Sequence, residues 1–462
     1  MAGCADCISL SRQSRLMATT TAAMPDNPAH ASQERAGWRA WSSIGILLLL
    51  TFSSNIDRMI IGMLVEPIKA QLQLNDFQFS LLHGLAFAVF FALASVPMGW
   101  AADRFSRRWV LYLGATFWSL CTAACGLAQN FVHLFVARLG VGIGEAALNP
   151  AAYSIVGDIF PRRQLTFALA CLASGAAIAA GLGSAGGGYI IAWTQELGGF
   201  MGYAPWQMVF WIVGIPGVLL GPLVFLIPER KKPLPVRAAP LAADDGFVPW
   251  LGQNRRYFFC VSFAIGAHTA LGTTSFWVPS LLARTQGLEM KEIGLMLGLV
   301  TGIPTTIGYL GGGWLVDRLV ARGVENAQLR FLIINTALLC VVGTVAYGFV
   351  TNLHLLLVLL AINNLLLPCA GPVIAHLQMT APASARARVA ATFLMIMHLT
   401  GTVLGPSLAA MFSDYFYGGK DHIGQGMATV YALGGSLGVV LFVLALAPAQ
   451  RALERARARD AG

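Results

Sequence analysis

The chain contains twelve apolar stretches, each long enough to cross a lipid bilayer as a helix. A transmembrane helix needs about 20 predominantly apolar residues. Only 11% of the residues are charged, whereas a soluble domain carries about 25%. These features predict an all-α membrane protein, with helices at approximately 40–64, 78–102, 108–129, 131–156, 165–193, 206–227, 257–282, 290–316, 330–351, 353–380, 389–413 and 425–447.

A short motif at the end of the second stretch occurs again at the end of the eighth, 214 residues later. Gly, Trp, Asp, Arg and a closing Arg keep the same spacing, and each copy leads into a basic loop. Duplicated helical halves are typical of secondary transporters. The repeat predicts two pseudo-symmetric bundles of six helices, with copies at Gly99-Trp100-Ala101-Ala102-Asp103-Arg104-Phe105-Ser106-Arg107-Arg108 and Gly313-Trp314-Leu315-Val316-Asp317-Arg318-Leu319-Val320-Ala321-Arg322.

The positions of Lys and Arg predict how the chain is oriented. Of the 30 basic residues, 24 fall on one side of the predicted helices and four on the other, and cytoplasmic loops carry the basic excess. We therefore expect a multi-pass protein of the inner (plasma) membrane with both termini cytoplasmic. The net charge of +9 then reflects topology, and we expect no nucleic-acid partner. The predicted organisation is a disordered cytoplasmic tail (1–37), a first bundle (38–227), a hydrophilic cytoplasmic linker (228–256), a second bundle (257–447) and a cytoplasmic tail (448–462).

The loop between the second and third helices resembles the signature loop of the major facilitator superfamily, with the pattern Gly-xxx-Asp-Arg-xx-Arg-Arg at 99–108. Other segments resemble spinster-type transporters of that superfamily. They are Asn55-Ile56-Asp57-Arg58, Phe117-Trp118-Ser119, Arg138-Leu139-Gly140-Val141-Gly142-Ile143-Gly144-Glu145-Ala146, Gly157-Asp158-Ile159-Phe160 and Gly181-Leu182-Gly183. The resemblance implies a six-plus-six helix fold, alternating access, and a central cavity lined mainly by helices 1, 4, 7 and 10. Eukaryotic members of this family are associated with sphingosine phosphate and lysophospholipids.

Four charged side chains lie deep in the predicted helices: Asp57, Arg58, Arg138 and Glu145. A charge at the bilayer centre costs at least about 2.5–3.5 kcal/mol, so it usually faces a polar cavity or a partner. At 1.5 Å per residue Asp57 and Arg138 lie at similar depth, and the implied fold makes their helices neighbours, so an ion pair between them is feasible. Arg138 and Glu145 are two turns apart on one helix face.

This group has two interpretations. In the functional one, the carboxylates of Asp57 and Glu145 bind and release a proton while Arg58 and Arg138 hold them ionised or bind an anion. Burial raises a carboxylate pKa and a nearby Arg lowers it, so a carboxylate between these influences can titrate during transport. Glu145 is the stronger candidate because it lies deeper. In the alternative, the group is a static ion-pair cluster that fixes helix packing.

The second half has no such charges, and its corresponding residues are neutral or titratable. We expect proton coupling in the first half and much of the substrate selectivity in the second. A single membrane histidine is more often a packing residue that hydrogen-bonds between helices. The candidate cavity residues are His268, Thr273, Thr274, Asn363, Asn364 and His398.

The two basic loops are predicted to form an inner gate. In the family pattern, Asp103 braces the opposite bundle through the positive N-terminal end of helix 11, where a carboxylate is favoured. The alternative is that the loops are solvated topology signals. The predicted gate residues are Gly99, Asp103, Arg104, Arg107, Arg108, Asp317 and Arg318.

We therefore expect a secondary transporter, proton-coupled, for a small amphiphilic or anionic solute, with lysolipid- and sphingolipid-like molecules as candidates. The alternatives are an uncoupled facilitator or exporter of organic anions or drugs, and a membrane receptor or scaffold that does not transport. We expect no enzyme activity, cofactor or metal, because the sequence has no nucleophile motif, phosphate-binding loop or metal-ligand cluster. The expected partners are the substrate, protons and the bilayer, and we expect a monomer.

Overall fold

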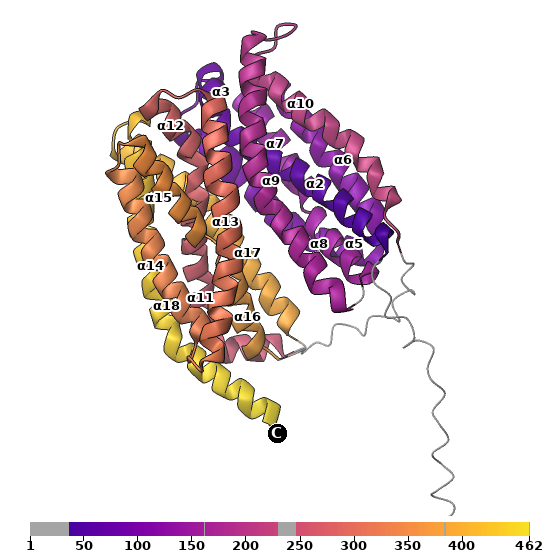
Figure 1. The fold of residues 1–462 in the computed structure, drawn as a ribbon, viewed down its shortest axis with the longest axis vertical. Coiled ribbons are helices and arrows are strands. Elements are labelled where there is room, and N and C mark those ends of the chain that lie inside the picture. Colours follow the sequence, from indigo (N-terminus) through magenta and orange to yellow (C-terminus); the bar gives the residue numbers. More distant parts are fainter. Residues whose placement is uncertain (1–36, 161, 230–245, 383–384, 462) are drawn as a thin grey trace, which may run out of the picture.

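The computed structural model describes residues 37–160, 162–229, 246–382 and 385–461, and these fold into two helical bundles that stand side by side (Figure 1). The regions expected to be the N-terminal tail (1–37) and the linker (228–256) lie largely outside the described residues. The helices of the first bundle are α2 (Trp38–Met63), α3 (Val65–Leu72), α4 (Asp76–His83), η2 (Gly84–Val89), α5 (Phe90–Arg104), α6 (Arg107–Cys125), α7 (Phe131–Glu145), α8 (Leu148–Ile159), α9 (Arg162–Glu196), α10 (Pro205–Leu220) and η3 (Gly221–Leu226).

The second bundle repeats this organisation with long helices that cross the molecule and short ones that break or cap them. Its elements are α11 (Phe247–Thr273), η4 (Thr274–Trp277), α12 (Val278–Gln286), α13 (Met290–Ala321), α14 (Ala327–Gly348), α15 (Leu353–Leu366), α16 (Ala370–Thr380), α17 (Arg386–Met411), η5 (Phe412–Phe416), η6 (Lys420–His422) and α18 (Ile423–Ala461).

The observed helices follow the twelve predicted stretches. Ten helical segments among the described residues are long and apolar enough to cross a membrane. Two less apolar helices complete the bundles: α6 packs on α7 and α10, and α11 packs on α17 and α18. Two boundaries differ from expectation. Helix α11 begins inside the range expected for the linker, and α18 continues as one helix to Ala461 where a separate tail was expected.

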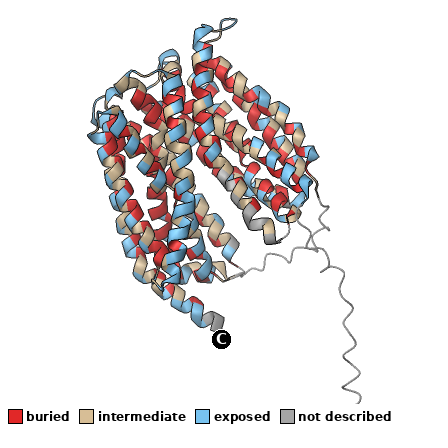
Figure 2. Ribbon diagram, in the orientation of Figure 1, coloured by how far each residue is buried: buried red, intermediate tan, exposed pale blue. Residues whose placement is uncertain are grey.

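The burial pattern is that of a protein surrounded by lipid. Buried residues lie between the helices, while exposed residues cover the outer faces of both bundles (Figure 2). Many of these exposed residues are large and apolar, such as Leu93, Leu113, Leu299 and Val341. A soluble monomer rarely exposes apolar surface on this scale.

We call the end with the basic loops the inner end, following the predicted topology, and the opposite end the outer end. The bundles lie close together at the outer end and further apart at the inner end, where the described chain finishes (Figure 1).

Helices α9 and α13 form a close contact between the bundles, and glycine makes it feasible. A Cβ atom added at Gly181 would lie 2.9 Å from the carbonyl oxygen of Gly298, and one added at Gly298 would lie 2.8 Å from the carbonyl oxygen of Gly181. Small residues let membrane helices approach this closely. Gly181 and Gly188 of α9 therefore lie where the two bundles meet, whereas Gly183 faces Ile56 of α2 in its own bundle.

Candidate functional site

The four charges that the sequence places deep in the first bundle form two ion pairs between α2 and α7. In the first pair, Arg138 Nη1 donates to Asp57 Oδ2 at 3.0 Å. Both side chains are at most 2% exposed. The two residues are thus level, as their depths in the sequence predicted. Arg138 also lies against the ring of Phe87, with its guanidinium carbon 5.5 Å from the ring centroid.

In the second pair, Arg58 holds Glu145. Arg58 Nε and Nη2 both donate to Glu145 Oε2, at 2.8 and 2.5 Å, and Ser54 Oγ donates to the same oxygen at 2.9 Å. The rings of Phe87 and Phe91 lie 4.8 and 5.1 Å from the Arg58 guanidinium carbon. The sequence did not predict this pairing, because it required knowing which way the adjacent Asp57 and Arg58 point.

Each carboxylate keeps one oxygen without a hydrogen-bond partner. Asp57 Oδ1 and Glu145 Oε1 are both buried and unpaired. Most buried polar atoms in proteins have a partner, so an unpaired one calls for an explanation.

A cavity of about 250 Å³ lies between the bundles next to the second ion pair. Arg58 lines this cavity, and its side chain is 29% exposed, whereas that of Glu145 is fully buried. His83 from α4 and Phe276 from η4 line the same cavity. Their rings are stacked, with centroids 4.2 Å apart and an interplanar angle of 22°. The cavity therefore presents one cation of the first bundle among mainly apolar and aromatic side chains.

Two of the predicted cavity residues line this cavity, namely Thr273 and Asn364. Thr273 Oγ1 donates to the carbonyl oxygen of Gly401 at 2.9 Å, and Asn364 Nδ2 donates to that of Leu360 at 2.9 Å. The hydrogen-bonding groups of these two side chains that are not used in these bonds are available to a ligand in the cavity.

The other predicted residues of helices 7 and 10 lie inside the second bundle. Thr274 Oγ1 donates to the carbonyl oxygen of Ala270 at 2.7 Å. Asn363 Oδ1 accepts a hydrogen bond from the hydroxyl of Tyr431 at 3.1 Å. Both side chains are buried, and neither lines the cavity beside Arg58.

His268 is completely buried and packs between helices. Its Nδ1 lies 2.9 Å from Thr336 Oγ1, and its Nε2 lies 3.2 Å from the carbonyl oxygen of Leu367. Leu367 lies just before Pro368, where helix 10 is broken into α15 and α16. The position of His268 thus matches the packing alternative, since it contacts a carbonyl that the helix break exposes. His398, by contrast, is half-buried, and its ring lies edge-on to Phe91 with centroids 6.2 Å apart.

The predicted inner-gate residues of the first loop contact their own bundle. Arg107 is buried, and its Nη1 lies 2.5 Å from Asp158 Oδ2. Glu229, which follows η3 in the chain, accepts a hydrogen bond from the backbone N–H of Arg107 at 2.7 Å and lies 3.8 Å from Arg108 Nε. Glu229 therefore holds the start of α6, where a carboxylate is favoured by the helix dipole.

The remaining gate residues are mostly exposed. The guanidinium of Arg104 lies 5.4 Å from the ring centroid of Trp100, and that of Arg318 lies 5.2 Å from the ring centroid of Trp314. The two copies of the motif thus share this cation–π contact. Asp317 is exposed, and Gly99 has only Pro150 near the position of a Cβ, at 4.0 Å. Asp103 lies in the last turn of α5, and its side chain is outside the described part of the chain.

Two cavity residues, His83 and Phe276, were not predicted from the sequence. His83 could have been found, because it is a titratable residue inside the second predicted helix. Phe276 gave no signal, because one phenylalanine in a membrane helix is normally lipid-facing or buried in packing.

The fold and the buried site define a membrane transport protein. The family model described as Major Facilitator Superfamily matches residues 47–401. The chain therefore belongs to the Major Facilitator Superfamily.

Individual relatives refine this picture. An MFS-type efflux pump from Mycolicibacterium smegmatis is 30% identical over 91% of this chain and 96% of its own length. Protein spinster homolog 3 from Mus musculus is 24% identical over 86% of this chain and 79% of its own length. A bacterial homologue of the human lysosomal transporter spinster, solved in an inward-facing and unoccupied conformation, superposes with a TM-score of 0.71 at 23% identity, covering 90% of this chain and 98% of that one. The last comparison supports the fold.

Proposed function

We propose that this protein is a proton-coupled secondary transporter that moves a small amphiphilic anion by alternating access. The observation that carries the proposal is the position of Arg58. This residue is ion-paired with a fully buried glutamate and at the same time lines the cavity between the bundles. Arg58 can therefore exchange one anionic partner for another without leaving its place.

The exchange couples a proton to the substrate. When Glu145 binds a proton, it no longer neutralises Arg58, and the anionic group of a substrate in the cavity takes its place. A proton alone would leave the arginine unpaired, and an anion alone would leave the glutamate unpaired. Leaving the fully buried glutamate unpaired costs about 3–5 kcal/mol, and leaving the partly exposed arginine unpaired costs less. The proton and the anion are therefore bound and released together.

The lining of the cavity supports an amphiphilic substrate. The cation of Arg58 lies at one side, while Met59, Met63, Phe276, Leu297 and Leu360 supply most of the apolar wall. Ligand sites of this kind are mainly apolar with a few placed polar groups that fix orientation. A lysolipid- or sphingolipid-like molecule, with one charged group and one apolar chain, has this chemistry.

A second candidate function is uncoupled export of organic anions or drugs. The 30% identical efflux pump favours it. In that case both ion pairs would be packing devices, and transport would follow the substrate gradient alone. A receptor or scaffold without transport activity would need neither the cavity cation nor the two buried pairs.

The test is a substrate screen followed by a flux measurement. Thermal unfolding of the purified protein would be recorded with lysolipids, fatty acids, sugars, organic anions and drugs. Compounds that raise the melting temperature would then be assayed in proteoliposomes with and without an imposed pH gradient. Gradient-driven accumulation of an anionic amphiphile supports the proposal. Equal uptake with and without the gradient supports the uncoupled exporter, and no uptake of any binding compound supports the receptor.

A further inference from the structure

One polar side chain of the cavity has no part in the proposed exchange between Arg58 and Glu145. His83 lines the cavity, and neither of its ring nitrogens has a hydrogen-bond partner among the described residues. Only Nδ1 is fully buried, so Nε2 is the nitrogen that a ligand in the cavity can reach. Most buried polar atoms in proteins are paired, and His83 therefore calls for a partner from outside the protein.

The other polar side chains that line the cavity already have partners. The guanidinium of Arg58 donates to Glu145, and the hydroxyl and amide groups donate to backbone carbonyl oxygens. Those hydroxyl and amide groups belong to Ser184, Thr273, Ser275, Thr301 and Asn364. Within the described part of the chain, His83 is thus the one polar side chain of the cavity lining that makes no hydrogen bond.

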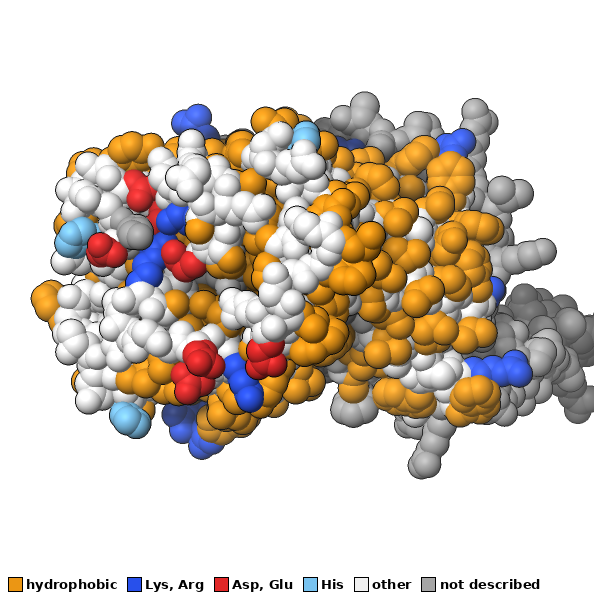
Figure 3. All heavy atoms as spheres, turned by 90° about the horizontal axis from the view of Figure 1, so that it is seen from above, with side chains coloured by type: hydrophobic (Ala, Val, Ile, Leu, Met, Phe, Trp, Pro, Cys, Tyr) orange, Lys and Arg blue, Asp and Glu red, His pale blue; other side chains and the backbone are white. Residues whose placement is uncertain are grey.

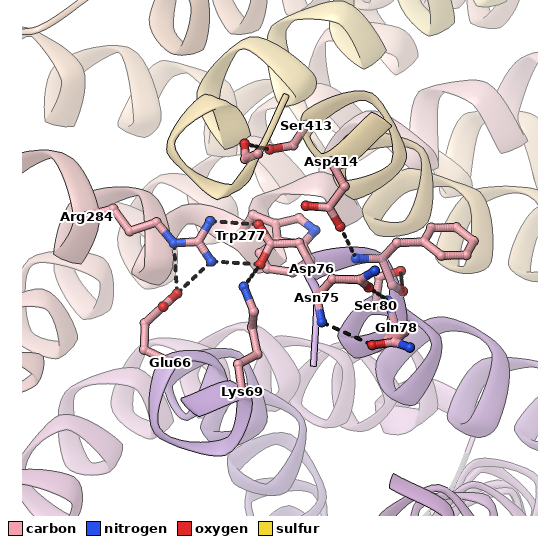
Figure 4. A network of polar contacts seen from close by, with 12 residues as sticks. Glu66, Lys69, Asn75, Asp76, Gln78, Ser80, Trp277, Arg284, Ser413 and Asp414 are labelled. Atoms are coloured by element: carbon pink, nitrogen blue, oxygen red, sulfur yellow. Dashed lines mark hydrogen bonds and ion pairs between the residues drawn. The ribbon is translucent and has the colours of Figure 1, made fainter. Parts of the chain in front are cut away.

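Helix α4, which ends at His83, is held against the second bundle along its length. At its start, both carboxylate oxygens of Asp76 accept hydrogen bonds from Nη1 and Nη2 of Arg284 in α12, at 2.7 and 2.8 Å (Figure 4). One turn further on, the hydroxyl oxygens of Ser80 and Ser407 lie 3.3 Å apart. The position of His83 is therefore set by contacts on both bundles.

The ion pair at the start of α4 is buried although it lies near the outer end. The side chain of Asp76 is fully buried, and that of Arg284 is 8% exposed. Burial opposes the charge of Arg284, but hydrogen bonds and charges from Asp76 and Glu66 outweigh it and raise the pKa of the guanidinium. Seen from the outer end, small groups of acidic and basic side chains lie among uncharged ones (Figure 3). The start of α4 is therefore fixed by a pair that stays ionised.

The end of α4 is fixed as well, by the ring of His83 and by the backbone that follows it. The ring is stacked on that of Phe276 in η4. A Cβ atom added at Gly84, the next residue, would lie 3.1 Å from the carbonyl oxygen of Val403 in α17. The imidazole therefore has little freedom to lose when a ligand binds it, and such preorganisation increases affinity.

The chemistry of the imidazole indicates which group it would bind. In a neutral imidazole each nitrogen is either a donor or an acceptor, depending on the tautomer, whereas a hydroxyl can donate and accept. We propose that His83 is a specificity residue whose Nε2 forms a hydrogen bond with a hydroxyl group of the substrate. This role rests on the proposed function, in which Arg58 binds the anionic group. It narrows the substrate class to anionic amphiphiles that carry a hydroxyl close to the charged group, such as hydroxy acids and glycerol-based lysolipids.

The experiment compares two anionic amphiphiles that differ by one hydroxyl, decanoate and 3-hydroxydecanoate. Their dissociation constants are measured at pH 7 by competition with radiolabelled decanoate on the purified protein in nanodiscs. The readout is the ratio of the two constants, because partition of each probe into lipid is the same for every variant.

Three variants are compared with the wild type. His83→Phe keeps a ring on Phe276 but removes both nitrogens, and His83→Gln supplies an amide that can donate and accept. Thr301→Ala is the matched control, because the hydroxyl of Thr301 also lies in the cavity lining but already donates to the carbonyl oxygen of Leu297 at 2.6 Å. Each variant is first checked for a single symmetrical peak by size exclusion.

We expect the wild type to bind 3-hydroxydecanoate about three- to tenfold more tightly than decanoate, which is the effect of one hydrogen bond. His83→Phe should abolish or reverse this preference, because the hydroxyl then enters an apolar surrounding without a partner. His83→Gln should retain part of the preference, and Thr301→Ala should retain all of it. If His83→Phe does not fold, His83→Leu takes its place in the same comparison.

Two results would overturn the role of His83 and leave the proposed function standing. One is equal affinity of the wild type for both probes, and the other is a full preference that survives in His83→Phe. Binding of neither probe would overturn this role and the proposed function together. Since no pH gradient is used, proton coupling is judged by its own test.

Discussion

The substitution Glu145→Gln separates proton coupling from substrate binding. Glutamine has nearly the same shape as glutamate, and its carbonyl oxygen can still accept from Arg58 and Ser54, which contact Glu145 Oε2 in the native chain. What it loses is the negative charge and the ability to take up a proton. In the proposed exchange, the variant resembles the protonated state at every pH.

The size of the expected effect follows from the gradient. One pH unit corresponds to about 1.4 kcal/mol per proton, which is a tenfold concentration ratio. A transporter that moves one proton with each substrate molecule can therefore accumulate the substrate up to about a hundredfold across two pH units. Any contribution of the membrane potential acting on the substrate's charge comes in addition to this factor. Glu145→Gln should reduce this factor to about one. Loss of the charged partner costs stability, but the partial exposure of Arg58 places the loss below the range for a fully buried pair, at about 1–3 kcal/mol.

The assay measures substrate uptake into proteoliposomes across imposed pH differences of zero, one and two units. Counterflow exchange without a gradient measures whether the substrate is still bound and carried across the membrane. Ser54→Ala is the matched control, because it removes a hydrogen bond to the same oxygen but leaves the carboxylate able to titrate. We expect Glu145→Gln to retain exchange and lose the gradient dependence, and Ser54→Ala to retain both. Wild-type accumulation by both Glu145→Gln and Asp57→Asn would reduce the two ion pairs to packing devices.

Three further outcomes are expected. Arg138→Ala should lower the free energy of unfolding by about 3–5 kcal/mol, because it leaves the buried Asp57 carboxylate unpaired. Adding Asp57→Asn in the same chain should restore part of this loss. Thermal unfolding of the single and double variants measures both changes. Gly181→Val should destabilise the protein by about 1–3 kcal/mol, because the added side chain meets the Gly298 carbonyl oxygen; a melting temperature equal to that of the wild type would contradict the close contact. Asp103→Asn should loosen the inner closure and increase the inward-open population, and spin labels across the inner end that show the same distances as in the wild type at several pH values would argue against a gate.

The class of fold could be predicted from the sequence because the bilayer restricts the choice. A chain that crosses lipid must satisfy its backbone within each segment, so long apolar stretches imply helices. The repeat from Gly99 to Arg108 and from Gly313 to Arg322 then implied two halves. An ion pair between Asp57 and Arg138 was feasible from the sequence, because depth along a helix follows from residue number and the family resemblance implied that the two helices are neighbours.

The orientation of side chains was not accessible in the same way. Asp57 and Arg58 are adjacent, and only the packing of α2 against α7 decides that the first faces Arg138 and the second faces Glu145 and the cavity. The sequence placed His268 among the candidate cavity residues, although a single membrane histidine more often serves helix packing. Only the break at Pro368 shows that it contacts a carbonyl that would otherwise lack a partner.

What the sequence determined by itself is therefore local in character: which segments enter the membrane, which carry charge there, and which face of each helix those charges share. What only the tertiary structure decided is which segments meet. Asp76 and Arg284, which are 208 positions apart, form an ion pair between the bundles, and both lie at helix ends, where periodicity carries no information. Contacts between the bundles depend on how two rigid units lie against each other, and no spacing along one chain encodes that arrangement.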